Sequence, residues 1–544
     1  IEVGGGSQQH PGIELYPGTS MKALDCVFTL PLGIAADAAP VDLEGCRVSG
    51  GTLRMRGGGG RVVDTAFDRA GVEVTGEARA ELRGLRFTGP SHGHALVVAD
   101  RAAPEITECS FTGTGTEENL TVGVVGGASP SLTDCTVDDA AGRGIWVGQR
   151  STPSFTRLRV SGGVRDQVAL LVEEDSRASF RDCAVSAAAG PVLFVHQAEA
   201  RVSGLEVDGA ANDVIQGVGA RISVDGARLR DVSGTSLNLQ GSARAEVRGL
   251  HVRSSPSQAG EEPKPGIRLS GARADIDDST ITGTGADVGV IARESALALR
   301  SVEVSSVLAG VRILDDTTLK AEGLTVARCH KSALLVEAGA YGEVVGADLR
   351  VLGGGTNGVT VAAGGRLSIK DSTVAGGENG MAVLDGGAAT AEETTVTGAN
   401  QVGAGVKDGG RLRLVRCTLR RNGQKDLHAD PGSVLQVEDT DTEKGLPEQT
   451  VRAAADRSAP APSVPPADAG ADARPLGEVL AELDAMVGLD GVKKEVRALV
   501  DLHRVNAKRV EAGLPSLDFS RHLVFSGPPG TGKTTVARIY GQVL

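Results

Sequence analysis

The chain has 544 residues, 76 of them glycine, with 40% hydrophobic residues and a formal net charge of −13. A chain this acidic does not offer the clustered Lys and Arg that a nucleic-acid groove needs, and it has no run of about 18 apolar residues that could insert into a membrane. Its length predicts at least two folded units.

A six-residue phrase recurs nineteen times between residues 23 and 442: apolar, any residue, Gly or acid, small or apolar, any residue, apolar. Residues 132–137, Leu-Thr-Asp-Cys-Thr-Val, are one copy, and the commonest steps are 22 and 23 residues. Each period also carries a second short apolar stretch, such as Gly144-Ile145-Trp146-Val147. Short Val-, Ile- and Leu-rich runs at a fixed period predict strands stacked in a solenoid. We expect residues 1–442 to form a right-handed parallel β-helix of about 19 coils of 20–29 residues, because the leucine-rich-repeat signature is absent.

The third position of the phrase is Gly seven times and Asp or Glu nine times. Gly accepts positive φ and Asp hydrogen-bonds its own backbone, so these residues are predicted to form sharp corners. A ladder of general acids (Asp134, Asp182 and Asp278), in the style of β-helix pectin-degrading enzymes, is the alternative. We favour corners, because glycosidases need a carboxylate pair in a cleft, and sugar clefts tend to offer aromatic platforms.

The fourth position holds six of the seven cysteines; only Cys329 lies elsewhere. A small, largely apolar slot that points inward suits a free thiol. Cys26 and Cys46, and likewise Cys109 and Cys135, fall on neighbouring coils, but parallel side-chain vectors disfavour disulfides. The spacing contains no C-x-x-C pair for zinc. We therefore expect reduced core thiols and a cytoplasmic location.

Two loops stand out along the array. The longest step, 29 residues, contains the insertion Ser254 to Pro265, a candidate contact loop. His92-Gly93-His94 lacks nearby ligands in metal-binding spacing, so we interpret it as an ordinary loop.

From residue 443 the phrase stops, and Ala, Pro and Asp dominate to about residue 475. This composition predicts a semi-rigid linker. A helix is then predicted around Val492 to His503, since Val492, Val496 and Leu499 mark one apolar face. Gly513 and Pro515 end it.

Residues 522–543 carry the strongest chemical signal in the chain. The apolar run His522-Leu523-Val524-Phe525 predicts a strand, and a predicted helix follows the loop Gly527-Pro528-Pro529-Gly530-Thr531-Gly532-Lys533-Thr534-Thr535. This is G-x-x-x-x-G-K-[ST], the phosphate loop (Walker A motif), in its strand–loop–helix context. Backbone N–H groups of such a loop surround the phosphates of ATP. Lys533 would reach the β- and γ-phosphates and the Thr534 hydroxyl would ligate Mg²⁺, so these two are the candidate catalytic residues.

Residues 476–544 resemble the beginning of an AAA+ ATPase module, most closely that of the CbxX/CfqX group. That group includes red-type Rubisco activases, a sporulation ATPase and ATPases associated with type VII secretion. Besides the phosphate loop, the resemblance rests on Leu483-Asp484-Ala485-Met486-Val487-Gly488-Leu489-Asp490-Gly491-Val492-Lys493 and on Arg521-His522-Leu523-Val524-Phe525. It implies that Val487 and Gly488 line the adenine pocket and that the complete module forms a homo-oligomeric ring. Pro528 departs from the Asn that is common in this group and follows the wider AAA+ form.

Together these features predict an ATP-binding AAA+ ATPase whose β-helix arm recruits or senses a protein partner for remodelling or secretion. The alternatives are a β-helix carbohydrate-active enzyme of the pectate-lyase type fused to an ATPase, and a structural β-helix interaction protein. The sequence starts at Ile1 and has few residues after the phosphate loop to hold Walker B, sensor and arginine-finger residues. We therefore expect a fragment of a longer ATPase that does not itself turn over ATP.

Overall fold

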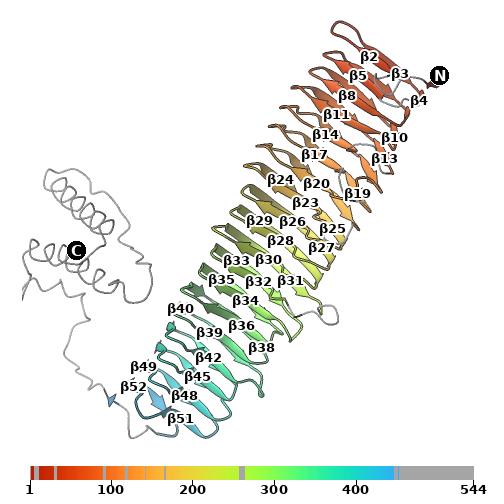
Figure 1. The fold of residues 1–544 in the computed structure, drawn as a ribbon. Coiled ribbons are helices and arrows are strands. Elements are labelled where there is room, and N and C mark those ends of the chain that lie inside the picture. The colour runs from red at the N-terminus through yellow and green to blue at the C-terminus, as the bar shows by residue number, and fades with distance from the viewer. Residues whose placement is uncertain are drawn as a thin grey trace, which may run out of the picture. The chain divides into compact units, whose positions relative to one another are not determined.

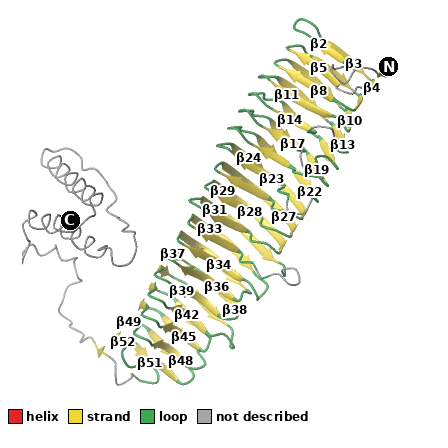
Figure 2. Cartoon of the chain, viewed as in Figure 1, coloured by secondary structure: helices red, strands yellow, loops and turns green. Residues whose placement is uncertain are grey.

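The computed structural model of the chain describes residues 2–4, 12–29, 33–89, 94–116, 120–140, 142–163, 167–256, 262, 264–445 and 451–452. Strands are the regular elements within these ranges, and none of them includes a helix (Figure 2). They stack into a parallel β-solenoid of about 18 turns that lies within a compact unit ending at residue 455 (Figure 1). At about 4.8 Å per turn the solenoid is roughly 90 Å long.

Every coil contributes three strand segments, and each pairs in parallel with the same segment of the next coil. The first two segments flank the corner of the phrase, and the third is the second apolar stretch. The third segments form one sheet of 19 strands: β2 (Ile13–Leu15), β5 (Gly33–Asp37), β8 (Thr52–Arg56), β11 (Gly71–Thr75), β14 (Leu96–Val98), β17 (Val122–Val124), β20 (Ile145–Val147), β23 (Leu170–Glu173), β26 (Leu193–His196), β28 (Ile215–Val218), β30 (Leu237–Gln240), β32 (Ile267–Ser270), β34 (Val288–Arg293), β36 (Ala309–Leu314), β39 (Ser332–Val336), β42 (Asn357–Val361), β45 (Asn379–Val383), β48 (Val402–Val406) and β51 (Lys425–Ala429).

The segments before the corner are separate strands at both ends of the solenoid: β3 (Met21–Leu24), β6 (Val41–Glu44), β9 (Gly59–Val63), β12 (Arg79–Arg83), β15 (Glu105–Thr107), β18 (Ser131–Thr133), β21 (Ser154–Thr156), β24 (Arg177–Arg181), β37 (Thr318–Glu322), β40 (Tyr341–Val345), β43 (Arg366–Lys370), β46 (Ala388–Glu392), β49 (Arg411–Val415) and β52 (Val434–Glu438). In the five middle coils they continue through the corner as single strands: β27 (Glu199–Ala210), β29 (Arg221–Val232), β31 (Arg244–Ser254), β33 (Arg273–Thr282) and β35 (Ala296–Ser305).

The segments after the corner complete the second sheet: β1 (Glu2–Gly4), β4 (Val27–Thr29), β7 (Arg47–Ser49), β10 (Ala66–Asp68), β13 (Arg86–Thr88), β16 (Ser110–Thr112), β19 (Thr136–Asp138), β22 (Arg159–Ser161), β25 (Ala184–Ala188), β38 (Thr325–Cys329), β41 (Asp348–Val351), β44 (Thr373–Ala375), β47 (Thr395–Thr397), β50 (Thr418–Arg420) and β53 (Asp441–Thr442). The short strand β54 (Val451–Arg452), inside the segment 443–475, pairs with β52.

The core is one continuous apolar column that runs the length of the solenoid. The first residue of each phrase is buried in all nineteen copies, from Ala23 to Val437. Aromatic rings stack between coils in this column: Phe87 lies 5.0 Å from Phe67 and 4.7 Å from Phe111, centroid to centroid. The apolar positions of the phrase therefore point inward as the repeat predicts.

None of the described residues belongs to a helix that is long and apolar enough to cross a bilayer.

Candidate functional site

The predicted nucleotide site at residues 527–535, with Val487 and Gly488, lies outside the described residues. Its ATP and Mg²⁺ ligands stay predictions. The insertion Ser254 to Pro265 lies only partly within the described ranges. The geometry below therefore concerns the solenoid.

The third phrase position is a left-handed corner in every coil. All nineteen residues at this position have positive φ, between 44° at Asp439 and 72° at Gly226. Asp134, Asp182 and Asp278 are among them, with φ of 55°, 52° and 47°. The prediction of corners is confirmed for the glycines and acids, and Arg157, Ser301 and Arg416, for which it was not made, adopt the same conformation.

Aspartates in the corner column lie against glycines of the next coil. A Cβ atom built on Gly45 would lie 2.3 Å from Asp25 Oδ1, and one built on Gly204 would lie 2.4 Å from Asp182 Oδ1. These carboxylates thus occupy the space that a side chain on the neighbouring corner would need. They fit the stacked turn and do not converge on a shared cleft.

The fourth phrase position points into the wall of the solenoid; where it holds Cys, Ser or Thr the side chain hydrogen-bonds a carbonyl, and the other copies hold Leu, Ala or Val. The Cys417 thiol donates to the Val415 carbonyl at 3.4 Å, and the Ser372 hydroxyl donates to the Lys370 carbonyl at 2.6 Å. The Ser372 oxygen also accepts the Ala347 N–H of the preceding coil at 3.0 Å. All seven cysteines are free and buried, as predicted. Small donors fill this slot because they satisfy a carbonyl there without leaving a void.

Cys329, the cysteine outside the slot, is also a buried donor. Its thiol donates to the Ser332 carbonyl at 3.1 Å and to the Leu308 carbonyl at 3.3 Å. Burial raises the pKa of Cys329, as it does for Cys183 and Cys417. Such thiols are inert core groups rather than nucleophiles.

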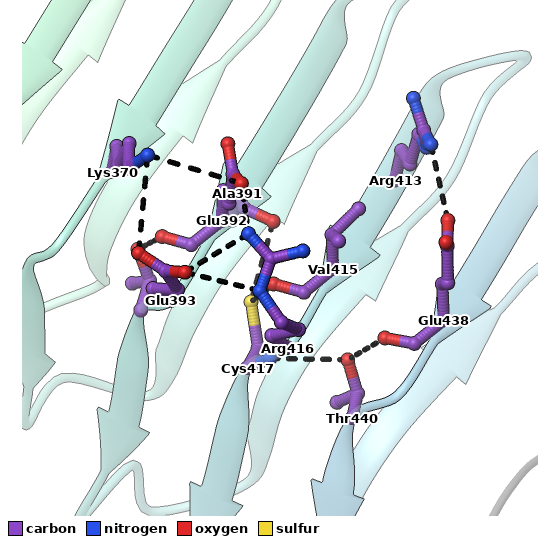
Figure 3. Close-up of polar contacts among 11 residues, drawn as sticks. Lys370, Ala391, Glu392, Glu393, Arg413, Val415, Arg416, Cys417, Glu438 and Thr440 are labelled. Atoms are coloured by element: carbon purple, nitrogen blue, oxygen red, sulfur yellow. Dashed lines mark hydrogen bonds and ion pairs between the residues drawn. The ribbon is translucent and has the colours of Figure 1, made fainter. Parts of the chain in front are cut away.

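A cluster of charged side chains lies at and beside the corner positions of successive coils near the C-terminal end of the solenoid (Figure 3). Arg416 pairs with Glu392 and, at 2.9 Å, with Glu393. Lys370 Nζ lies 3.9 Å from both carboxylates. The Arg416 hydrogen bond lowers the pKa of Glu393, whereas a hydrogen bond with Glu393 raises the pKa of Asp371. Because every carboxylate here has a charged or hydrogen-bonding neighbour on another coil, the cluster links three consecutive coils.

Four shallow hollows form a continuous line along the turns and first segments of the middle coils. Their volumes are about 660, 510, 410 and 410 Å³. Neighbouring hollows share lining residues, first Arg150 and Asp175, then Glu199 and Arg221. We call this line the charged groove; its charged lining residues are Arg101, Arg150, Glu174, Asp175, Arg177, Glu199, Arg201, Arg221, Asp225, Arg244, Glu246, Arg248, Asp275, Asp277 and Arg300.

Several acids of the charged groove are held in ion pairs. Asp277 lies 2.7 Å from Arg300, and Glu199 lies 2.8 Å from Arg201. Over the described part of the chain, no group of three or more His, Cys, Asp or Glu is arranged to hold a metal ion. The carbohydrate-active alternative required convergent carboxylates or a Ca²⁺-type aspartate cluster in such a groove, and these residues give it no support.

His94 is a loop contact. Its Nδ1 accepts the Leu120 N–H at 2.9 Å, and burial lowers its pKa. His92 and Gly93 lie outside the described ranges.

Two aromatic side chains on the outer face of the solenoid were not predicted from the sequence. Trp146 is the middle residue of β20, and Phe194 is the second residue of β26. Both side chains are half-buried, and buried residues flank each of them along the strand. The alternation within Gly144-Ile145-Trp146-Val147 was the available signal, because it places Trp146 opposite to Ile145 and Val147.

Residues 70–219 match the family model of the right-handed β-helix region. This match covers a part of the solenoid and agrees with the predicted hand of its coils.

A separate, partial likeness connects the chain to secretion-system proteins. It is 46% identical over 72 residues to the ESX-5 secretion system protein EccA5 of Mycobacterium marinum, which is 13% of this chain and 12% of that protein. It is 42% identical over 86 residues to the ESX-1 protein EccA1 of Mycolicibacterium smegmatis, 15% and 14% of the two chains. The ESX-2 protein EccA2 of Mycobacterium tuberculosis is 35% identical over 146 residues, 25% and 22%. The chain thus spans less than a quarter of the length of these relatives.

Among solved structures, the periplasmic alginate epimerase AlgG aligns with 81% of this chain and 83% of its own at 10% identity, with a TM-score of 0.22. The PL6 family alginate lyase AlyGC aligns with 74% and 97% at 7% identity, with a TM-score of 0.20. Scores this low support no argument about activity.

Proposed function

We propose that this chain belongs to an ATP-binding AAA+ ATPase, of the CbxX/CfqX-like group, whose β-helix arm binds a protein partner. The observation that carries the proposal is the phosphate loop at residues 527–535 in its strand–loop–helix pattern. The partial identity to three EccA proteins supports the same assignment. The matched length of 72 residues is close to that of the segment 476–544.

In this proposal the loop residues hold ATP with Mg²⁺. Backbone N–H groups of the glycine-rich loop bind the phosphates, Lys533 neutralises charge on the β- and γ-phosphates, and the Thr534 hydroxyl binds the metal. Val487 and Gly488 contact the adenine. ATP turnover further requires acidic, sensor and arginine residues from the rest of a ring-forming AAA+ module.

The solenoid supplies an extended surface rather than a reactive centre. Its corner acids are structural, its thiols are buried, and acids in its charged groove are ion-paired. A regular stack of coils of this kind is well suited to present a long binding face. We therefore assign partner recognition to the solenoid and the energy-consuming step to the ATPase, in the cytoplasm.

Nucleotide binding tests this proposal. Isothermal titration of the chain with ATP and Mg²⁺ should give weak but measurable binding that Lys533→Ala abolishes and that Thr534→Ala makes insensitive to Mg²⁺. Lys320→Ala, which removes an exposed lysine from β37, is the matched control and should bind like the wild type. Equal binding by wild type and Lys533→Ala would contradict the proposal.

A further inference from the structure

An outward-facing column of four apolar side chains and one glycine crosses five consecutive coils of the sheet that the third segments form. In-register pairing places Val97 beside Gly123, Gly123 beside Trp146, Trp146 beside Leu171 and Leu171 beside Phe194. These residues lie on β14, β17, β20, β23 and β26, which are neighbours in Figure 1. We call this set, Val97, Gly123, Trp146, Leu171 and Phe194, the aromatic strip.

The placement of the aromatic residues sets this strip apart. The six other phenylalanines among the described residues are all in the core. Phe194 is half-buried on the outer surface, two coils from Trp146, which is the single tryptophan of the chain. Beyond Phe194 the same column turns polar, with Gln216 and Asn238. Large apolar side chains gathered on an outer face mark binding sites more often than isolated ones do.

The indole ring is held in place. Trp146 Nε1 donates to Glu173 Oε1 at 2.8 Å. A Cβ built on Gly148 would lie 3.0 Å from Trp146 Cζ2, so the ring lies over this glycine. Because the indole ring is already fixed by these contacts, it loses little conformational entropy when a partner covers it. Such preorganised aromatic side chains are typical of interface hot spots.

We propose that the aromatic strip binds an amphipathic helix of a partner protein, lying along the solenoid axis. This rests on the proposed function, in which the solenoid recognises a protein. The mixture of a valine, a leucine and two aromatic rings favours aliphatic protein side chains over a sugar, which would stack on rings alone.

The repeat of the strip matches the repeat of a helix. Residues of the strip recur once per coil, at about 4.8 Å, and the glycine at 123 leaves room on its coil for a side chain of the helix. Side chains on one helix face recur once per turn, at about 5.4 Å. Four coil steps span about 19 Å, which a helix of about 13 residues covers. A helix with apolar residues at three- and four-residue spacing therefore places one side chain on each coil.

Charge beside the strip selects the partner further. Glu173, Glu174 and Asp175 follow Leu171 after one residue, Val172. Arg101 and Arg150 line the same hollow as Glu174 and Asp175, and Arg101 is paired with Glu77. The three acids therefore outnumber the remaining arginine, Arg150, and complement lysines or arginines on the flank of an amphipathic helix.

The single tryptophan provides the readout. The chain is titrated with an 18-residue peptide that has Leu at three- and four-residue spacing and Lys elsewhere. A scrambled peptide of the same composition and the neutral sugar cellohexaose are titrated in parallel. We expect a blue shift of Trp146 emission with the patterned peptide only, because its helix removes water from the indole.

Two variants and one matched control locate the site. Leu171→Asp and Phe194→Asp should weaken peptide binding by about tenfold or more. Leu335→Asp should not, because Leu335 lies six coils beyond Phe194 along the same outward column, between the polar neighbours Arg312 and Thr360. All three positions are half-exposed, so circular dichroism should show unchanged folding.

Several outcomes would overturn the proposal: no shift with the patterned peptide, an equal shift with the scrambled peptide, an equal loss in Leu335→Asp, or a shift with cellohexaose alone. Titration with ATP and Mg²⁺ separates this proposal from the nucleotide assignment. Loss of ATP binding in Lys533→Ala together with any of these outcomes would reject the strip and leave the ATPase.

Discussion

Corner residues show how one backbone conformation organises each coil. A left-handed conformation is unfavourable by about 1–2 kcal/mol for residues other than glycine. Twelve of the nineteen corners are nevertheless not glycine, among them Arg157 and Glu393. Stacking on the coils above and below therefore imposes the conformation, and glycine relieves its strain where it occurs.

Substitution of corner glycines tests this view. Gly204 and Gly226 have similar φ, 67° and 72°, but only at Gly204 would a Cβ meet Asp182 Oδ1, at 2.4 Å. Gly226→Ala should destabilise the solenoid by about 1 kcal/mol through its backbone alone. Gly204→Ala should lower the midpoint of thermal unfolding further.

The double variant Gly204→Ala with Asp182→Gly is the control for the clash. It should recover the stability of Gly226→Ala, because it removes the carboxylate that the new methyl group meets. Equal midpoints of thermal unfolding for the two single glycine variants would show that the close contact between position 204 and Asp182 Oδ1 does not affect stability.

Thiol reactivity tests the assignment of the cysteines. All seven are buried, and burial raises the pKa of Cys183 and Cys417. A hydrogen bond with Cys135, together with burial, also raises the pKa of Cys109. The native protein should therefore react very slowly with a thiol reagent at pH 8, and denaturant should release seven thiols. Rapid labelling of the native protein, or fewer than seven thiols after denaturation, would contradict the model of reduced core cysteines.

Residue types at the corners and in the slot were largely predictable. Gly45 and Asp134 follow from the preference for positive φ, and the cysteines follow from the inward slot. Arg157, Ser301 and Arg416 could not be predicted as corners, since arginine and serine have no such preference and only the coils beside them set the conformation. The outward direction of Trp146 was available from strand alternation.

Elements of the solenoid differ in how the corner is accommodated. In β27, β29 and β31 the strand continues through the corner, whereas β24 and β25 are separate strands around Asp182. The phrase is the same in both cases, so the sequence pattern predicts that strands form but not which of them merge.

The ionic cluster of Figure 3 joins elements across coils. Arg416→Gln should lower the midpoint of thermal unfolding at pH 7 and low salt, and the loss should shrink at high salt because the groups are exposed and screened. Arg366→Gln, at an exposed position on β43 without a described ion pair, is the control and should change little.

The pH dependence of this effect has a definite sign. The lowered pKa of Glu393 in the folded protein means that its contribution is present above its unfolded pKa and is lost as pH falls through the folded pKa. The raised pKa of Asp371 acts in the opposite sense, since its contribution is lost as pH rises. The difference between wild type and Arg416→Gln should therefore fade in acid, and a difference that grows in acid would contradict the pairing.

At the scale of the whole molecule, the repeat forms a long solenoid, whereas the proposed nucleotide-binding residues belong to one short motif, residues 527–535. The solenoid carries the charged groove and the aromatic strip, to which we assign partner recognition by proposal. The phosphate loop carries the residues that we propose bind ATP. The period of the phrase predicted the solenoid because each coil contacts only its neighbours. Strand alternation could place Trp146 on the outer face, but the proposed strip as a set was not predictable, because the outward positions of this solenoid carry no repeated signal.

ATP hydrolysis by the intact gene product tests the central claim most directly. Steady-state turnover is measured for the wild type, Lys533→Ala and the control Lys320→Ala. We predict turnover in the wild type and in Lys320→Ala, and its loss in Lys533→Ala. Absence of ATP hydrolysis in the wild type, or an equal rate in Lys533→Ala, would contradict the assignment of this chain to an AAA+ ATPase.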